Sequence, residues 1–214
     1  MPEPVTIPIS IFDVTMDFTR PNLRLAITGQ EVVEELFESF AKWDAKGDDI
    51  EVIKEGKPSE QGVKFKLPKR RTSFFFGPVN CRLIWDDANW ETAAETIEIL
   101  QSALAVVHKT GKAEIGSYKT SIALHAQPKN IGFIQLFQPL AAPQLLKLEP
   151  APLKAFATVV KWENRRITLD NSAQLANAIF LRFEREFPAS ATLEEIAHAL
   201  LECEDGNHAR MRSM

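Results

Sequence analysis

Residues 72–109 read TSFFFGPVNCRLIWDDANWETAAETIEILQSALAVVHK, and this stretch decides the fold class. Its first half predicts two short β-strands, over residues 72–76 and 79–85, which the Gly77-Pro78 turn separates. Its second half predicts a long amphipathic helix over residues 90–109. A strand pair followed directly by such a helix is typical of an α+β fold built on antiparallel sheet.

Three helices are expected in all, and each has its own start signal. Asn89 is the N-cap of the helix from Trp90 to about Lys109, whose inward stripe is predicted to be Ala93, Ile97, Leu100, Leu104 and Val107. A capping box of Thr28 and Glu31 starts a helix over residues 29–46. A second box, Thr192 and Glu195, starts a short C-terminal helix over residues 193–202.

Alternating apolar residues predict strands on both sides of these helices. The first strand is a single long one whose inward face switches near Ile11 and Phe12. Segment 179–187 fits both strand and helix spacing, and we favour strand. The last two strands before it should form a hairpin across Glu163-Asn164. Besides the two strands above, we expect strands over residues 5–18, 50–54, 63–67, 115–126, 132–137, 156–162, 165–169 and 179–187.

The expected fold is therefore α+β, with mainly antiparallel sheet, two long helices packed on one face and a short C-terminal helix. Residues 1–204 are predicted to form a single domain, followed by a polar tail over residues 205–214. A proline-rich stretch, residues 139–152, would either divide this domain as a linker or cross its surface as a strap. We favour the strap.

Composition narrows the class of protein. Fourteen Phe against one Tyr, within 214 residues that are 45% hydrophobic, predict a thick apolar core. A net charge of -4 works against the whole chain acting as a polyanion binder. Two cysteines without a C-x-x-C pair indicate neither a disulfide framework nor a zinc site. No stretch approaches the roughly 20 apolar residues that span a bilayer, so we expect a cytoplasmic protein with no membrane contact.

Catalytic candidates are few. The sequence has no nucleophile elbow, P-loop or dinucleotide-binding glycine motif, and its four histidines show no helical metal-site spacing, so no metal and no cofactor is expected. An enzyme would have to assemble its site from distant residues, with His125, Asp86, Asp87 and Arg82 as candidates at the ends of neighbouring predicted strands. The alternative, which we favour, is that His125 is an ordinary strand residue and that the carboxylates of Asp86 and Asp87 stabilise the start of the helix that follows.

A nucleic-acid site could lie on the predicted hairpin over residues 64–76, where basic side chains alternate with Phe. Such a pair of strands can hold phosphates and stack single-stranded bases. The candidate ligands are Lys66, Lys69, Arg70 and Arg71. The alternative is that the Phe side chains face the core while the basic groups lie in solvent, as alternation alone would arrange them. We favour this second interpretation.

The order of elements resembles a sporadically distributed bacterial family of uncharacterised α+β proteins of similar length. The resemblance covers most of the chain and rests locally on the Phe76-Gly77-Pro78 turn, the helix led by Trp90 and the Ile115-Gly116-Ser117-Tyr118 strand. The chain departs from the family at Ile122-Ala123-Leu124-His125, where the family has Arg, Tyr and Asn. The resemblance implies an α+β fold from a bacterium or its phage and implies no activity or site residues.

Apolar excess without a catalytic constellation favours a non-enzymatic protein-interaction or self-associating module. Uncovered edges in a sheet-rich chain invite pairing, so we expect a protein partner or a homodimer. An enzyme assembled from distant residues is the first alternative. A nucleic-acid binder acting through hairpin 64–76 is the second.

Overall fold

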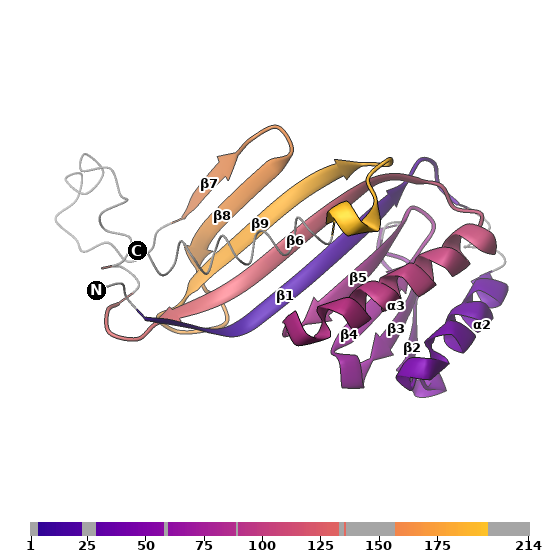
Figure 1. Cartoon of the computed structure of the whole chain (residues 1–214), viewed down its shortest axis with the longest axis horizontal. Helices are drawn as coiled ribbons and strands as arrows, with labels where there is room; N and C mark the ends of the chain where they lie inside the picture. The colour runs from indigo at the N-terminus through magenta and orange to yellow at the C-terminus, as the bar shows by residue number, and fades with distance from the viewer. Residues whose placement is uncertain are drawn as a thin grey trace. The chain divides into compact units, whose positions relative to one another are not determined.

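The computed structural model describes residues 4–22, 29–57, 60–88, 90–132 together with Gln135, and 157–196. These residues form a nine-stranded sheet with the strand order β2-β3-β4-β5-β1-β6-β9-β8-β7. The pairings between its strands are antiparallel, and helices are few, which confirms the predicted α+β class. Figure 1 shows the elements in chain order.

Nine strands carry most of the regular structure, and their bounds lie close to those predicted. They are β1 (Val5–Phe18), β2 (Ile50–Ile53), β3 (Gly62–Leu67), β4 (Thr72–Phe76), β5 (Asn80–Asp86), β6 (Ile115–Pro128), β7 (Thr158–Lys161), β8 (Arg165–Asn171) and β9 (Ile179–Pro188). The ambiguous segment 179–187 is a strand. The strand predicted over residues 132–137 lies outside the described residues.

The chain divides into two compact units. The helical unit comprises residues 11–120 and 186–196, and the hairpin unit comprises residues 4–10, 121–132 and 157–185, among the residues described. Strands β1, β6 and β9 supply residues to both units. Segment 139–152 and tail 205–214 lie outside the described residues, so the linker or strap assignment stays a prediction.

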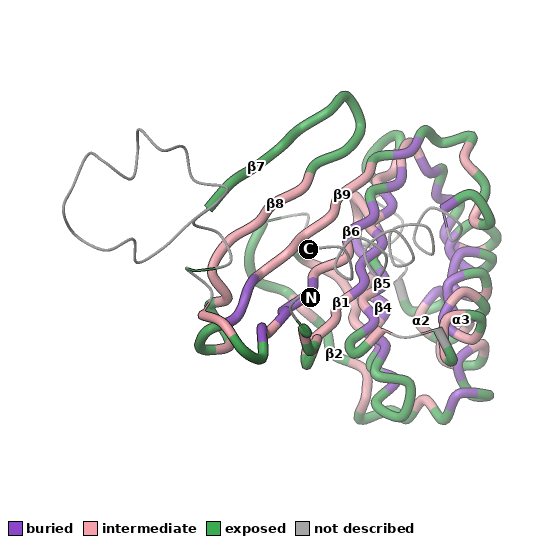
Figure 2. The backbone as a smooth tube through the Cα atoms, turned by 60° about the vertical axis from the view of Figure 1, so that its left-hand side comes forward, coloured by how far each residue is buried: buried purple, intermediate pink, exposed green. Residues whose placement is uncertain are grey.

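In the helical unit, β1 to β5 form antiparallel ladders covered on one side by helices α2 (Gly29–Phe40) and α3 (Trp90–Lys109). The two helices contact one another, and Figure 2 shows them side by side next to β4 and β5. Between helices and sheet lies an aromatic cluster, in which Phe40 meets Phe65, Phe74 and Trp43 edge-on at 5.5 to 6.1 Å. Side chains of this kind dominate core stability.

Helix α3 has the predicted bounds, but the prediction of two long helices is wrong. Helix α2 has 12 residues against 20 in α3, because the chain tightens into a 3-10 turn at Ala41–Trp43. Asp44 then adopts a left-handed conformation with a φ of 63°, and its N–H donates to the Ala41 carbonyl. The turn buries Trp43, whose ring meets Phe40 edge-on.

The described residues of α3 bury a stripe shifted slightly from the predicted one. Leu100, Leu104 and Val107 are buried as expected, but Ala93 and Ile97 are only half-buried. Thr96, Ile99 and Ala103 are buried instead.

The second capping box is confirmed, because the N–H of Thr192 donates to Glu195 and the N–H of Glu195 donates to the Thr192 hydroxyl. Only residues 193–196 of that helix are described, and no described helix is long and apolar enough to cross a membrane.

In the hairpin unit, β7, β8 and β9 form a meander. Direct cross-strand neighbours share a face, so the register places Val160, Ile167 and Phe183 on one face. The same face carries a small apolar cluster built on Ala126 and Ile179, with Val5, Ile7, Leu169 and Leu181 packed against it. The predicted hairpin across Glu163-Asn164 is confirmed.

Candidate functional site

His125 lies on β6 in the hairpin unit and is buried, with 4% of its surface exposed. Its Nδ1 is 2.8 Å from the Ser172 hydroxyl, and the Phe180 ring lies against the imidazole with 5.2 Å between centroids. Burial lowers the pKa of His125 below its ordinary value. Sequence reasoning selected the histidine but missed Ser172, which follows the end of β8.

The hydrogen bonds of Ser172 settle the tautomer of His125. The Ser172 oxygen accepts the N–H groups of Gln174, at 3.2 Å, and Leu175, at 2.9 Å. Both of its lone pairs are therefore occupied, so its own O–H must donate to His125 Nδ1. The imidazole is then neutral with its proton on Nε2. A serine whose oxygen is tied to two backbone groups is a turn residue and a poor nucleophile.

The other three catalytic candidates lie in the helical unit at or just beyond β5. Arg82 is bound to Asp13 on β1, with Nε 2.6 Å from Oδ2 and a second contact from its terminal nitrogen. Asp13 is buried and also accepts a hydrogen bond from the Thr15 hydroxyl. This carboxylate, which sequence reasoning missed, interrupts the apolar run between Phe12 and Val14. Arg82 therefore neutralises a buried charge.

Asp86 and Asp87 mark the end of β5. The N–H of Asp86 donates to the Arg71 carbonyl, and the Asp87 carboxylate forms an ion pair with the Arg71 guanidinium. Arg71 and Asp87 both adopt left-handed backbone conformations, with φ values of 48° and 57°. The pair thus joins the two chain segments that flank strands β4 and β5. Within the helical unit, Arg82 and Asp87 serve separate ion pairs.

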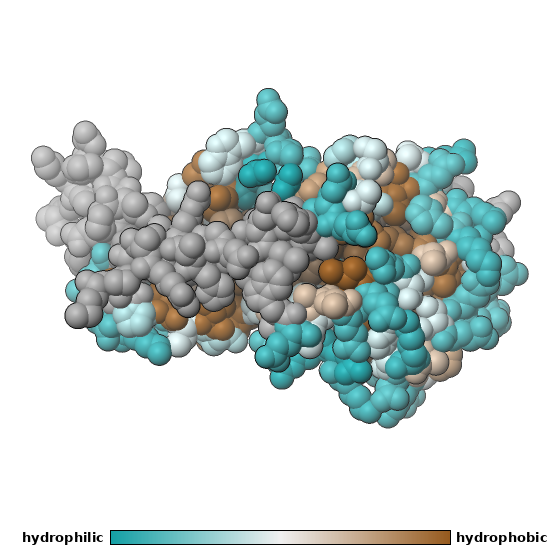
Figure 3. All heavy atoms as spheres, viewed as in Figure 1, coloured by the Kyte–Doolittle hydropathy of each residue, from teal (hydrophilic) through white to brown (hydrophobic). Residues whose placement is uncertain are grey.

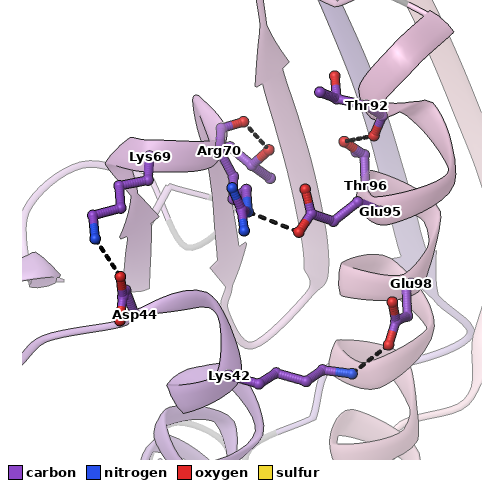
Figure 4. A network of polar contacts seen from close by, with 9 residues as sticks. Lys42, Asp44, Lys69, Arg70, Thr92, Glu95, Thr96 and Glu98 are labelled. Carbon is purple, nitrogen blue, oxygen red and sulfur yellow. Dashed lines mark hydrogen bonds and ion pairs between the residues drawn. The ribbon is translucent and has the colours of Figure 1, made fainter.

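The four basic candidates on hairpin 64–76 each have an acidic partner in the helical unit. Lys66 binds Glu51 at 2.9 Å and Arg70 binds Glu95 at 2.8 Å, while Lys69 binds Asp44 and Arg71 binds Asp87. Figure 4 shows the Lys69 and Arg70 contacts. The adjoining lysines hold the pKa values of Asp44 and Glu51 below their usual range.

The Phe side chains of the same hairpin face the core. Phe65, Phe74 and Phe76 are buried and Phe75 is half-buried. Stacking platforms for bases need exposed rings, and phosphate contacts need cations whose charge is not already compensated. The geometry therefore matches the interpretation in which alternation sends the rings inward and the charges outward.

Cys81 and the described acidic and histidine residues offer little reactive chemistry. Cys81 is fully buried with its sulfur 4.0 Å from Met16, and burial raises the pKa of its thiol. Cys81 therefore packs as a small apolar core residue. Among the residues that the structure describes, no three His, Cys, Asp or Glu side chains are grouped as a metal ion would need.

Among the described residues of the hairpin unit, the most exposed large apolar side chains lie on its edge strand, β7, and at Trp162 directly after it. Val159 is 53% exposed, Val160 44% and Trp162 52%, and every residue of β7 is exposed. Hydrophobic residues reach the surface where β7 and β8 lie (Figure 3). Among the strands that the structure describes, β7 is last in the order and pairs with β8 alone. An exposed apolar edge of this kind is a template for another strand.

Comparison with known proteins adds no assignment. No protein-family model matches the chain, and no curated protein sequence matches it. The resemblance to a bacterial family therefore stays a prediction.

Proposed function

We propose that the chain is a non-enzymatic protein-interaction or self-associating module that binds through the edge strand β7. The observation that supports this proposal is the exposure of Val159 and Val160 on β7 and of Trp162 just after it, where β8 is the only neighbouring strand among the described residues. Proteins normally protect an edge strand with charges, proline or a bulge. Strand β7 carries a single charged residue, Lys161, between apolar neighbours.

Strand addition would give such a module both affinity and selectivity. The main-chain groups of β7 would bond to an added strand, while side chains on alternate faces would choose its sequence. Val160 points to the same face as Ile167 and Phe183, so an added strand would extend an existing apolar surface. Arg165 and Arg166 lie on β8, so Lys161 is the one charged side chain on β7 itself.

We place this module in the cytoplasm of a bacterium. The support is the small number of cysteines, of which Cys81 is a buried free thiol, and the resemblance described above. The enzyme and nucleic-acid alternatives gain no support from the geometry, because their candidate residues serve intramolecular contacts in the described part of the chain.

The test is affinity capture that compares the wild-type chain with a Val160→Lys variant, read by mass spectrometry. Val52→Lys is the matched control, because Val52 is an equally prominent valine, 60% exposed, on the edge strand β2 of the helical unit. We expect binding, to another protein or to the chain itself, that Val160→Lys abolishes and Val52→Lys leaves intact. Equal capture by all three proteins, or none by the wild type at millimolar concentrations, would refute an interaction role for β7.

A further inference from the structure

The main-chain groups of β7 that point away from β8 can be identified from the hydrogen-bond pattern. The N–H of Trp162 donates to the Arg165 carbonyl at 2.8 Å, and the register pairs Val160 with Ile167 and Thr158 with Leu169. Residues of an antiparallel ladder face the neighbouring strand alternately. Thr158, Val160 and Trp162 therefore bond to β8. Val159 and Lys161 present their N–H and C=O groups on the side away from β8, where the structure describes no other strand.

This alternation limits how β7 could pair with a second copy of itself. In a two-fold antiparallel pair, one residue lies directly opposite its own copy on the same face of the sheet. A pair centred on Lys161 would oppose two ammonium groups. A pair centred on Val159 would leave Trp162 beyond the end of the partner strand. A pair centred on Val160 avoids both defects.

We propose that the partner of β7 is β7 of a second copy of this chain, antiparallel and centred on Val160. Val159 then lies opposite Lys161 of the second copy, so the outward N–H and C=O groups of both residues find partners. Val160 packs against its own copy, and Trp162 packs over Thr158 of the second copy. No two like charges lie directly opposite one another, so the strand is complementary to itself.

The other exposed edge is less suited to the same contact. Strand β2 has four residues, as β7 does, but its Glu51 already binds Lys66 across to β3. Because so few residues of β7 take part, the dimer should be weak, with a dissociation constant of about 10–100 μM. This inference rests on the proposed function and names its partner.

Single cysteines test the register, in a background where Cys203 is replaced by serine. In the proposed pair, the two copies of residue 160 form a non-hydrogen-bonded pair with Cα atoms about 4.5 Å apart, within disulfide range. The two copies of residue 159 would be about 8–9 Å apart, which is too far for a disulfide. We therefore expect Val160→Cys to form a disulfide dimer on mild oxidation, and Val159→Cys and the exposed control Val52→Cys to remain monomeric.

A second pair of variants tests the contact without a disulfide. Val160→Lys places two charges on the symmetry axis and should raise the dissociation constant about 30-fold or more in sedimentation equilibrium. Lys161→Pro removes an outward N–H while keeping the inward ladder to β8, and should weaken the dimer to a similar degree. Retained hydrogen-exchange protection of Ile167 would show that the hairpin is still folded.

The outcomes separate this inference from the proposed function. Efficient cross-linking through residue 159 alone would overturn the Val160-centred pair. A wild-type chain that stays monomeric to about 1 mM, with no cross-linking at residue 160, would overturn self-pairing altogether. If another protein were still captured through Val160 in that case, the interaction role would stand and only its partner would be wrong.

Discussion

Ser172→Ala should destabilise the hairpin unit through the buried imidazole of His125. The substitution leaves Nδ1 without its donor, and a buried acceptor without a partner costs about 1–3 kcal/mol. The N–H of exposed Gln174 can turn to water at little cost, and that of half-buried Leu175 adds a few tenths of a kcal/mol. We therefore expect a loss of about 1.5–3 kcal/mol in the free energy of unfolding.

The same contact should give the wild-type chain a pH dependence. Burial lowers the pKa of His125 in the folded state. Below the ordinary histidine pKa of 6.5, the imidazole therefore binds a proton in the unfolded chain while it stays neutral in the folded chain. The free energy of unfolding is then unaffected by this group above that pH. It falls as the pH drops from 6.5 toward the folded pKa, with a slope of at most about 1.4 kcal/mol per pH unit.

Urea titrations at pH 7.5 and 5.5, followed by circular dichroism, measure both effects. Ser172→Thr is the matched control, because it keeps the hydroxyl and should cost less than about 1 kcal/mol. His125→Asn keeps an acceptor for Ser172 but cannot titrate, so the difference between the two pH values should shrink relative to wild type. If Ser172→Ala cost less than about 0.5 kcal/mol, the assigned tautomer would be wrong. If His125→Asn kept the full pH dependence, a group other than His125 would be its source.

Three further predictions concern the helical unit. Arg82→Ala should lower the free energy of unfolding by about 1–3 kcal/mol in urea titrations, because it leaves the buried Asp13 carboxylate without its partner. In a double-mutant cycle, Asp13→Ala should remove most of that loss. Additive losses would show that the ion pair contributes nothing. Phe40→Ala should cost about 3–5 kcal/mol and Phe40→Leu far less, and similar melting temperatures for both would contradict the aromatic cluster. Gly62→Ala should lower the free energy of unfolding by about 1–3 kcal/mol, because the added Cβ would lie 2.2 Å from the Phe76 carbonyl oxygen. Gly47→Ala is the control and should be neutral, because no atom lies within 4 Å of its added Cβ. Equal losses of stability in the two variants would refute the clash.

Local pattern predicted most of the elements, because their signals are carried by neighbouring residues. Strand β1 spans residues 5–18 as expected, and its inward residues change from odd to even positions where Phe12 becomes buried. The bounds of α3 follow from its apolar spacing. The end of α2 could not be read in this way. The 3-10 turn at Ala41–Trp43 and the left-handed Asp44 end it, and no Gly or Pro marks that point in the sequence.

The candidate site was harder to predict, because ion pairs depend on which strands become neighbours. The sequence showed a basic run over residues 64–71 but not that Lys69 would meet Asp44 or that Arg70 would meet Glu95. Likewise Thr158-Val159-Val160-Lys161 predicts a strand in any sheet position. Only the strand order places it at an edge, and only the burial pattern shows it exposed on both faces.

The exposed valines on the two edge strands differ in what surrounds them. Val52 on β2 lies next to Glu51, whose ion pair with Lys66 puts charge beside it. On β7, two consecutive valines lie beside one lysine, and the exposed Trp162 follows directly. Charge on an edge strand discourages pairing, and β2 carries an ion pair with β3 where β7 carries one lysine beside two valines. That asymmetry favours β7 over β2 as the binding edge, and it is why Val52 is the control for Val160.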